Sequence, residues 1–391
     1  MESCKTFHMP STILYQQHAF EQVGERAVVL GKKALIISDQ IMQTLGYVAN
    51  CQDKLSEHSV KSTVFLGVAS EPNDQYVEEA LQLYQDENCD LIISLGGGSC
   101  IDTAKAVAVV ATNGGNIAEY VGMKKIAHIT PVPHIAIPTT AGTGSEATDV
   151  TVITNSTTTV KMMIKQPAFM PNIAIVDPLL TLSSPQKVTA ATGVDALSHA
   201  IEAYISKKSH PMTDMMALSA IQLISKNLQA AFTDGQNIEA REGMSLAALQ
   251  AGSAFSNASV CLVHGMSRPI GALFDVPHGF SNAMLLPAIL EYSKDSCINR
   301  LADIGRIFSS EALELSNEEA ADIAVQSVKN LCKSLDIPNL EKWGIPREEF
   351  VSALTKMSKD AIDSGSPGNN PKTPSQETIA DLYQVCYEYQ F

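Results

Sequence analysis

The first half of the chain alternates short apolar runs with amphipathic segments, and no other feature constrains the fold as strongly. Strands are expected at 12–15, 34–38, 63–66, 91–95, 135–137 and 173–176, with helical patterns at 20–30, 74–85 and 102–112. Alternating strands and helices form a parallel sheet, and such sheets bind ligands outside the carboxyl ends of their strands. The first half is therefore predicted to be an α/β domain with a ligand site at that edge.

A glycine-rich segment follows one of these strands. The run 91–95 leads into Gly96-Gly97-Gly98-Ser99, and a helix is expected from about Asp102. Glycines at this point let a phosphate reach the backbone, and the helix N-terminus supplies free N–H groups and a partial positive charge. Asp102 is either a helix-start residue or a cofactor contact, and the simpler interpretation of Lys105 is a solvated helix charge.

Two further polar groups follow strands. The segment 138–146, Pro-Thr-Thr-Ala-Gly-Thr-Gly-Ser-Glu, suits hydrogen bonding to a nucleotide, although an ordinary polar turn has the same composition. Asp39 follows the strand at 34–38, where a carboxylate can accept both ribose hydroxyls and repel a 2′-phosphate, which favours NAD. Because the acid precedes the glycines, the segment is not the GxGxxG fingerprint, and the sheet must use another topology.

The second half changes to a succession of helices. They are predicted at 186–205, 211–230, 239–255, 281–292, 298–310, 317–335, 347–361 and 376–388. We therefore predict an α/β dinucleotide-binding domain at 1–183 and an all-helical metal-binding domain at 184–391, with the active site in the cleft between them. The segment 363–374 is interpreted as either a lid or a flexible connection.

Four residues of the helical half are candidate metal ligands. Asp195 and His199 lie four residues apart in a helical pattern, so their side chains share one face. His264 and His278 each precede a glycine, and the prolines between them exclude one unbroken helix over both. One carboxylate and three imidazoles would form a mixed oxygen and nitrogen site. The simpler reading of Asp195 and His199 alone is a surface or capping pair.

Composition narrows the function classes. The net charge of −15 and the pI of about 5.0 argue against nucleic acid or an anionic membrane as partner. The 8 cysteines show no CxxC spacing, which indicates reduced thiols in the cytoplasm. The N-terminus has no long apolar run, so no signal peptide is expected, and the apolar windows are too short to span a bilayer.

Several motifs together resemble the iron-containing (group III) alcohol dehydrogenases, over nearly the whole chain. The motifs are Gly96-Gly-Gly-Ser-x-x-Asp102-x-x-Lys105, Pro138-Thr-Thr-Ala-Gly-Thr-Gly-Ser-Glu146, Ala191-Thr-Gly-Val-Asp-Ala-Leu-Ser-His-Ala-Ile-Glu202, His264-Gly-Met-Ser-Arg-Pro and Val276-Pro-His-Gly279. The resemblance implies a homodimeric, metal-dependent and NAD(H)-linked dehydrogenase that interconverts small primary alcohols and aldehydes.

The resemblance also implies roles for individual residues. One divalent ion, Fe2+ or Zn2+, would bind at Asp195, His199, His264 and His278. The pyrophosphate would lie at Gly97, Gly98 and Ser99, and the cofactor would be lined by Thr139, Thr140, Thr143 and Lys161. Without the resemblance, Lys161 would be read as a surface charge.

Arg268 departs from the family pattern, in which many members have histidine four residues after the third ligand. A guanidinium binds carboxylate, sulfonate or phosphate in a fork, so Arg268 is a candidate contact for an anionic aldehyde such as sulfoacetaldehyde or a semialdehyde acid. Alternatively, Arg268 pairs with a nearby acid such as Asp275, and the substrate is a plain aldehyde such as propanal or lactaldehyde.

Two other functions compete with the dehydrogenase. A lyase of the dehydroquinate synthase type also uses NAD and a metal, but it needs a basic pocket, and the stretches near the candidate ligands are apolar and poor in lysine. A catalytically inactive binding protein is disfavoured by the intact ligand set. Net turnover of NADH with a simple aldehyde distinguishes the dehydrogenase from the lyase, and metal analysis distinguishes it from the inactive binding protein.

Overall fold

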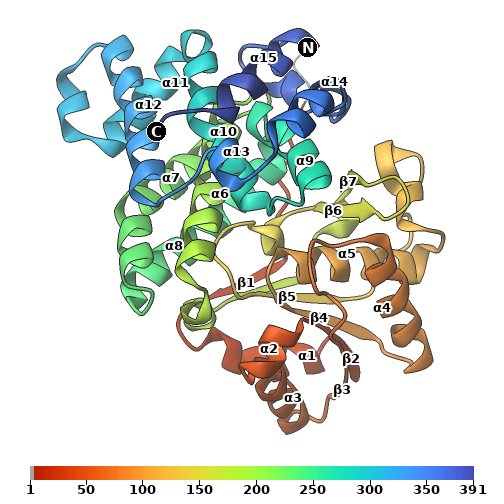
Figure 1. Ribbon diagram of the computed structural model, residues 1–391. Helices are drawn as coiled ribbons and strands as arrows, with labels where there is room; N and C mark the ends of the chain where they lie inside the picture. The colour runs from red at the N-terminus through yellow and green to blue at the C-terminus, as the bar shows by residue number, and fades with distance from the viewer. Residues whose placement is uncertain (1–3) are drawn as a thin grey trace. The chain divides into compact units, whose positions relative to one another are not determined.

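The computed structural model describes residues 4–391 and divides the chain into two compact units. One unit comprises His8–Ser184, and the other comprises Pro185–Phe391 together with the segment that ends at Phe7. The first unit contains the strands, and the second is built of helices (Figure 1).

The first unit is built on a six-stranded parallel sheet with the strand order β1-β8-β5-β4-β2-β3. The strands are β1 (Thr12–Tyr15), β2 (Lys33–Ile37), β3 (Lys61–Phe65), β4 (Leu91–Gly96), β5 (His134–Pro138) and β8 (Ile173–Val176). Every residue of β4 and β5 is buried, as expected of strands covered on both faces. The predicted parallel α/β sheet is confirmed, and its strand order is unlike that of the ordinary dinucleotide fold.

Apolar side chains of the central strands alternate between two cores, because successive residues of a strand point to opposite faces. Leu35 and Ile92 join the core that contains residues of α4 (Asp74–Asp86) and α5 (Gly98–Asn113). Ile36 and Ile93 join the core that contains residues of α1 (Val23–Val28) and α3 (Tyr47–Glu57). Helices on both faces thus hold β4 and its carboxyl end in place.

Several elements of this unit differ from the sequence prediction. The helix α5 begins at Gly98, four residues before the predicted start near Asp102, because the chain enters the helix directly from the glycines. The short α2 (Gln40–Thr44) and the antiparallel hairpin of β6 (Val150–Asn155) and β7 (Val160–Lys165) were not predicted. The hairpin turn contains neither glycine nor proline, so the usual signal is missing.

The second unit is formed by helices. They are α6 (Gln186–Ile205), α7 (Pro211–Thr233), α8 (Ile238–Ala258), α9 (Leu262–Phe274), α10 (His278–Ser293), α11 (Ile298–Phe308), α12 (Asn317–Ser334), α13 (Leu340–Trp343), α14 (Arg347–Asp363) and α15 (Gln376–Tyr387). The bounds of α6 agree with the prediction. Because Pro269 was taken as a break, α9 was not predicted, but the helix continues through this proline.

The segment proposed as a lid or flexible connection is held in place by hydrogen bonds. It contains a short 3-10 helix, η8 (Ser366–Asn369). The Asn369 side chain donates to the carbonyl of Val260 at 3.1 Å, and the Asn370 side chain donates to the Ser293 hydroxyl at 3.0 Å. These bonds tie the segment to the start of α9 and the end of α10.

Within residues 4–391, no single helix combines the length and apolar character needed to cross a membrane, and the bent pair α8 and α9 meets these criteria only when the two are taken together.

Candidate metal centre and nucleotide site

The four predicted metal ligands come together in the helical unit. Asp195 and His199 lie one turn apart on α6, His264 lies in the first turn of α9, and His278 is the first residue of α10. One potential ligand atom from each residue lies within 4.8 Å of the others. Three of the side chains are buried, whereas that of His278 is 28% exposed, so the cluster is reached from the side of His278.

The glycine after each of the two later histidines permits close packing. A Cβ atom on Gly265 would lie 2.7 Å from Cγ of Pro367 in η8. A Cβ atom on Gly279 would lie 2.8 Å from the backbone oxygen of Ala191 in α6. The His-Gly pairs noted in the sequence therefore reflect the tight contacts that hold α9 and α10 in position.

The charges in the cluster favour an ionised carboxylate. Asp195 Oδ1 lies 3.5 Å from His264 Nε2, 3.9 Å from His278 Nε2 and 4.0 Å from His199 Nδ1. Burial raises the pKa of Asp195, but the surrounding histidines outweigh burial and hold that pKa well below its usual range. One carboxylate oxygen and three imidazole nitrogens fit a single divalent ion, and the donor set suits Zn2+ or Fe2+.

A buried carboxylate behind His264 was not predicted as a site residue. Glu202 on α6 accepts hydrogen bonds from His264 Nδ1 at 2.6 Å and from the backbone N–H of Val263 at 2.6 Å. Burial lowers the pKa of His264, but Glu202 and Asp195 more than compensate and raise it overall. The available signal was the i,i+3 spacing of Glu202 from His199 on a helix that reads as apolar.

Asn282 is a second site residue that was not predicted. It lies one turn after His278 on α10 and is fully buried. Its side-chain nitrogen donates to Asp195 Oδ1 at 2.6 Å and lies 3.0 Å from His264 Nε2 and 3.2 Å from His278 Nε2. The amide nitrogen therefore contacts three of the four candidate ligands, at atoms that face the centre of the cluster.

Arg268 lies one turn after His264 on α9 and is 8% exposed. Its Nη1 donates to the hydroxyl of Ser366 at 3.0 Å. Burial lowers the pKa of Arg268 to about 10, although the negative charge of Glu202 acts in the opposite direction. Recognition of an anionic substrate by this guanidinium stays a prediction.

In the first unit, the three predicted polar groups follow neighbouring strands. Strand β4 pairs with both β2 and β5, so Asp39, the glycines from Gly96 and the segment from Thr139 lie at one edge of the sheet. The Thr139 N–H donates to the carbonyl of Gly96 at 3.0 Å. After β3 the chain crosses β2 to form β4, and such a reversal of strand order marks the ligand site in open parallel sheets.

The surroundings of Gly97 and Gly98, at the start of α5, differ in how closely they pack. Gly97 is the N-cap of α5, and a Cβ atom added there would lie 3.8 Å from the side chain of Thr140, which is an ordinary van der Waals contact. At Gly98, by contrast, a Cβ would lie 2.7 Å from Cγ2 of Thr143. The free N–H groups of the first turn of α5 and the space beside Gly97 fit a pyrophosphate.

The Asp39 carboxylate begins the short helix α2. Its Oδ1 accepts hydrogen bonds from the N–H groups of Ile41 at 2.8 Å and Met42 at 2.9 Å. Its Oδ2 lies 3.7 Å from the sulfur of Cys100 and faces the start of the glycine segment, because a Cβ on Gly96 would lie 3.5 Å from it. Ribose binding by Asp39 stays a prediction.

Asp102 and Lys105 form part of a buried polar network. Asp102 accepts hydrogen bonds from the Ser145 hydroxyl at 2.5 Å and the Val152 N–H at 2.8 Å. Lys105 is 1% exposed and donates to Ser145, Thr148 and Val150. The interpretation of Lys105 as a solvated charge is therefore wrong, and burial lowers the pKa of this amine to about 8.

Lys161 lies on β7, and its side chain is 4% exposed. Its amine lies 3.1 Å from a carboxylate oxygen of Glu71. The simpler reading of Lys161 as a surface charge does not hold, and its expected contact with the cofactor stays a prediction, as do those of Ser99, Thr139, Thr140 and Thr143.

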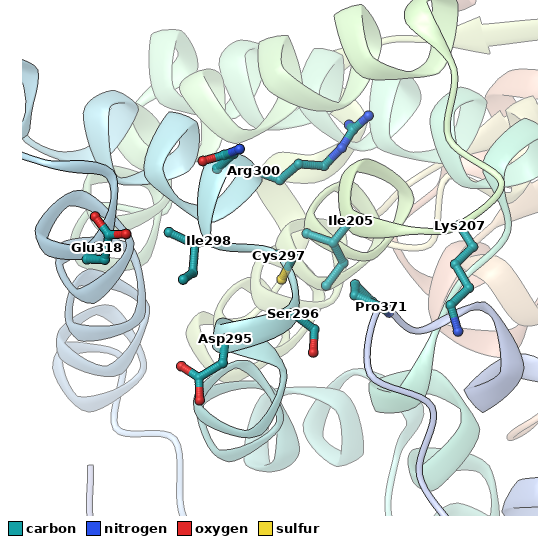
Figure 2. Close-up of a pocket in the computed structure, with 10 residues that line it drawn as sticks. Ile205, Lys207, Asp295, Ser296, Cys297, Ile298, Arg300, Glu318 and Pro371 are labelled. Atoms are coloured by element: carbon teal, nitrogen blue, oxygen red, sulfur yellow. The ribbon is translucent and has the colours of Figure 1, made fainter.

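A separate hollow of about 550 Å³ lies in the helical unit at the start of α11 (Figure 2). Lys207, Cys297, Arg300 and Pro371 are among the residues that line it. No candidate metal ligand lines this hollow. Burial raises the pKa of the Cys297 thiol to about 11, so the thiol is not an activated nucleophile.

A parallel-sheet unit with a glycine segment at the carboxyl end of a strand, and a helical unit with a His3Asp cluster, fit an enzyme that uses a nucleotide and a metal ion. Residues 10–178 match the family model of the iron-containing alcohol dehydrogenases. Residues 189–387 match the family model of the C-terminal domain of the same family. The chain belongs to the iron-containing alcohol dehydrogenase family, so it is an alcohol dehydrogenase that uses NAD(H) and one metal ion.

Individual relatives agree with this assignment. The chain is 37% identical to a 1,3-propanediol dehydrogenase of Citrobacter freundii, over 97% of this chain and 98% of that one. A solved 1,3-propanediol oxidoreductase superposes with a TM-score of 0.94 at 36% identity, covering 98% of this chain and 100% of that one. A sulfoacetaldehyde reductase of Bifidobacterium kashiwanohense, solved in complex with NAD+, superposes with a TM-score of 0.87 at 28% identity. The match covers 99% of this chain and 100% of that one.

Proposed function

We propose that the chain interconverts small primary alcohols and aldehydes with NAD(H), using one Fe2+ or Zn2+ ion at Asp195, His199, His264 and His278. The observation that carries the proposal is the convergence of these four side chains within 4.8 Å in a buried part of the helical unit. When bound, the metal acts as a Lewis acid toward the substrate oxygen, while the nicotinamide carries the hydride.

The side chains of this centre orient the reactants. The ionised Asp195 offsets the positive charge of the ion, and the exposed edge of His278 leaves a path for a small substrate. Burial of His199 and His264 limits the access of water to the other side. Direct hydride transfer requires contact between the substrate and the nicotinamide.

We propose that the cofactor pyrophosphate binds beside Gly97, Gly98 and Ser99, with Asp39 at the ribose. The first assignment is supported by the N–H groups of the first turn of α5 and by the absence of close packing around Gly97. The second is supported by the Asp39 carboxylate at the end of β2, beside the glycine segment. A carboxylate there disfavours NADP(H), because it repels a 2′-phosphate.

Two classes of substrate are compared, neutral aldehydes and aldehydes with an anionic tail. The resemblance to 1,3-propanediol dehydrogenases supports a neutral substrate, and that to a sulfoacetaldehyde reductase supports an anionic one. The burial of Arg268 and its bond to Ser366 weigh in favour of the neutral class. Turnover of propanal and sulfoacetaldehyde by wild type and Arg268→Gln separates them, since a role in substrate recognition requires a selective loss on sulfoacetaldehyde.

On the basis of the family resemblance, we also propose a homodimer.

The metal assignment is tested with His264→Ala. We expect this variant to lose bound metal and NAD-linked turnover of small alcohols, because one of four ligands is removed. Ser267→Ala is the matched control. It removes a buried hydroxyl from the same helix, and this hydroxyl donates to the backbone carbonyl of His264 at 3.3 Å. Metal content by mass spectrometry and NADH formation are measured together, and full occupancy with unchanged turnover in His264→Ala would contradict the proposal.

A further inference from the structure

The His264 ring has a carboxylate on the side that faces away from the other ligands. Its Nδ1 lies 2.6 Å from Glu202 Oε2, and its Nε2 lies 3.5 Å from Asp195 Oδ1. An ionised carboxylate can only accept a hydrogen bond, so the proton of the neutral ring must be on Nδ1. The lone pair is then on Nε2, the nitrogen that faces the cluster.

Glu202 is itself held in one position. Its second oxygen, Oε1, accepts the backbone N–H of Val263 at 2.6 Å, and the side chain is 1% exposed. Glu202 lies on α6, the helix that carries Asp195 and His199, whereas Val263 and His264 lie in the first turn of α9. The two bonds therefore fix both the orientation of the imidazole and the position of the helix that carries it.

We propose that Glu202 is a positioning residue, which orients the His264 ring so that Nε2 faces the other candidate ligands. The inference rests on the proposed metal site and adds a residue that does not touch the metal. Carboxylates that accept the second N–H of a metal-bound histidine raise its basicity and fix its tautomer, and their loss typically weakens metal binding by about 10- to 100-fold.

The test is the substitution Glu202→Gln, which keeps the size of the side chain. The amide can donate to Nδ1 and so permits the tautomer with the proton on Nε2, which blocks a metal bond. The matched control is Tyr204→Phe on the same helix, which removes a part-buried hydrogen bond of 2.6 Å from the Tyr204 hydroxyl to Asp303, a residue that is not a candidate ligand. His264→Ala serves as the reference for a lost ligand.

Three quantities are measured on each purified variant: the Zn2+ Kd by chelator competition, the visible spectrum of the Co2+-loaded protein, and the melting temperature of the metal-free protein. We expect Glu202→Gln to raise the Zn2+ Kd about 10- to 100-fold and to change the Co2+ spectrum. Tyr204→Phe is expected to leave the Zn2+ Kd and the Co2+ spectrum as in wild type.

Two results would overturn the inference. If folded Glu202→Gln keeps the wild-type Zn2+ Kd and Co2+ spectrum, Glu202 does not position a ligand. If Tyr204→Phe shows the same losses as Glu202→Gln, the effect comes from packing of α6. Unchanged metal binding in His264→Ala would instead refute the metal assignment itself, and with it any positioning role for Glu202.

Discussion

Gly97 and Gly98 are adjacent, and the structure predicts opposite consequences for the same substitution at the two positions. An alanine Cβ at Gly97 would lie 3.8 Å from its nearest neighbour, whereas one at Gly98 would lie 2.7 Å from Cγ2 of Thr143. Gly97→Ala should therefore leave stability nearly unchanged and weaken NADH binding. Gly98→Ala should destabilise the fold, because a side chain must move to make room.

The sizes of the two effects follow from the contacts. Overpacking typically costs about 1–3 kcal/mol, which we assign to Gly98→Ala. At Gly97 a methyl group would hold the pyrophosphate away from the N–H groups of α5. Loss of one hydrogen bond to a charged group costs about 1.5–3 kcal/mol, which corresponds to an increase of about 10- to 150-fold in the Kd for NADH.

The assay compares fluorescence titration of NADH with urea unfolding of the same samples, followed by circular dichroism without cofactor. The expected pattern is a weaker Kd with an unchanged urea midpoint for Gly97→Ala, and a lower midpoint for Gly98→Ala. Wild-type NADH affinity in Gly97→Ala would refute the placement of the pyrophosphate beside Gly97.

Two further predictions concern charge. Asp39→Asn keeps an acceptor for the N–H groups of Ile41 and Met42 but removes the negative charge, so it should relax the preference for NADH over NADPH. Repulsion of about 1–4 kcal/mol corresponds to a change of about fivefold to about 800-fold in the ratio of kcat/KM values, and equal use of both cofactors by wild type would contradict the prediction. Burial raises the pKa of Glu146 from 4.5 to about 7, so the folded state binds more protons than the unfolded state in this window and its stability falls as pH rises from 4.5 to 7. Glu146→Gln should therefore gain stability relative to wild type across this pH range in urea unfolding, and a constant difference would argue against the shift.

Local patterns were sufficient for many of the elements. Strands 12–15 and 173–176 and the helix 186–205 have the predicted bounds, because apolar periodicity and flanking polar residues are properties of the segment itself. The same reasoning failed where a local signal was absent or misleading. Pro269 suggested a break in a segment that stays helical, and the hairpin of β6 and β7 has a turn without glycine or proline.

The sequence by itself indicated the four candidate metal ligands and the glycine segment, because their motifs have recognisable spacings, and Asp39, because it follows a buried strand. Only the tertiary structure showed that Lys105 is buried, that Glu202 supports His264 and that Asn282 contacts three ligands. These contacts join residues far apart in the chain, such as Asp195 and Asn282, and they depend on how α6, α9 and α10 pack. No local pattern encodes that packing, since burial and partners are set by the path of the whole chain.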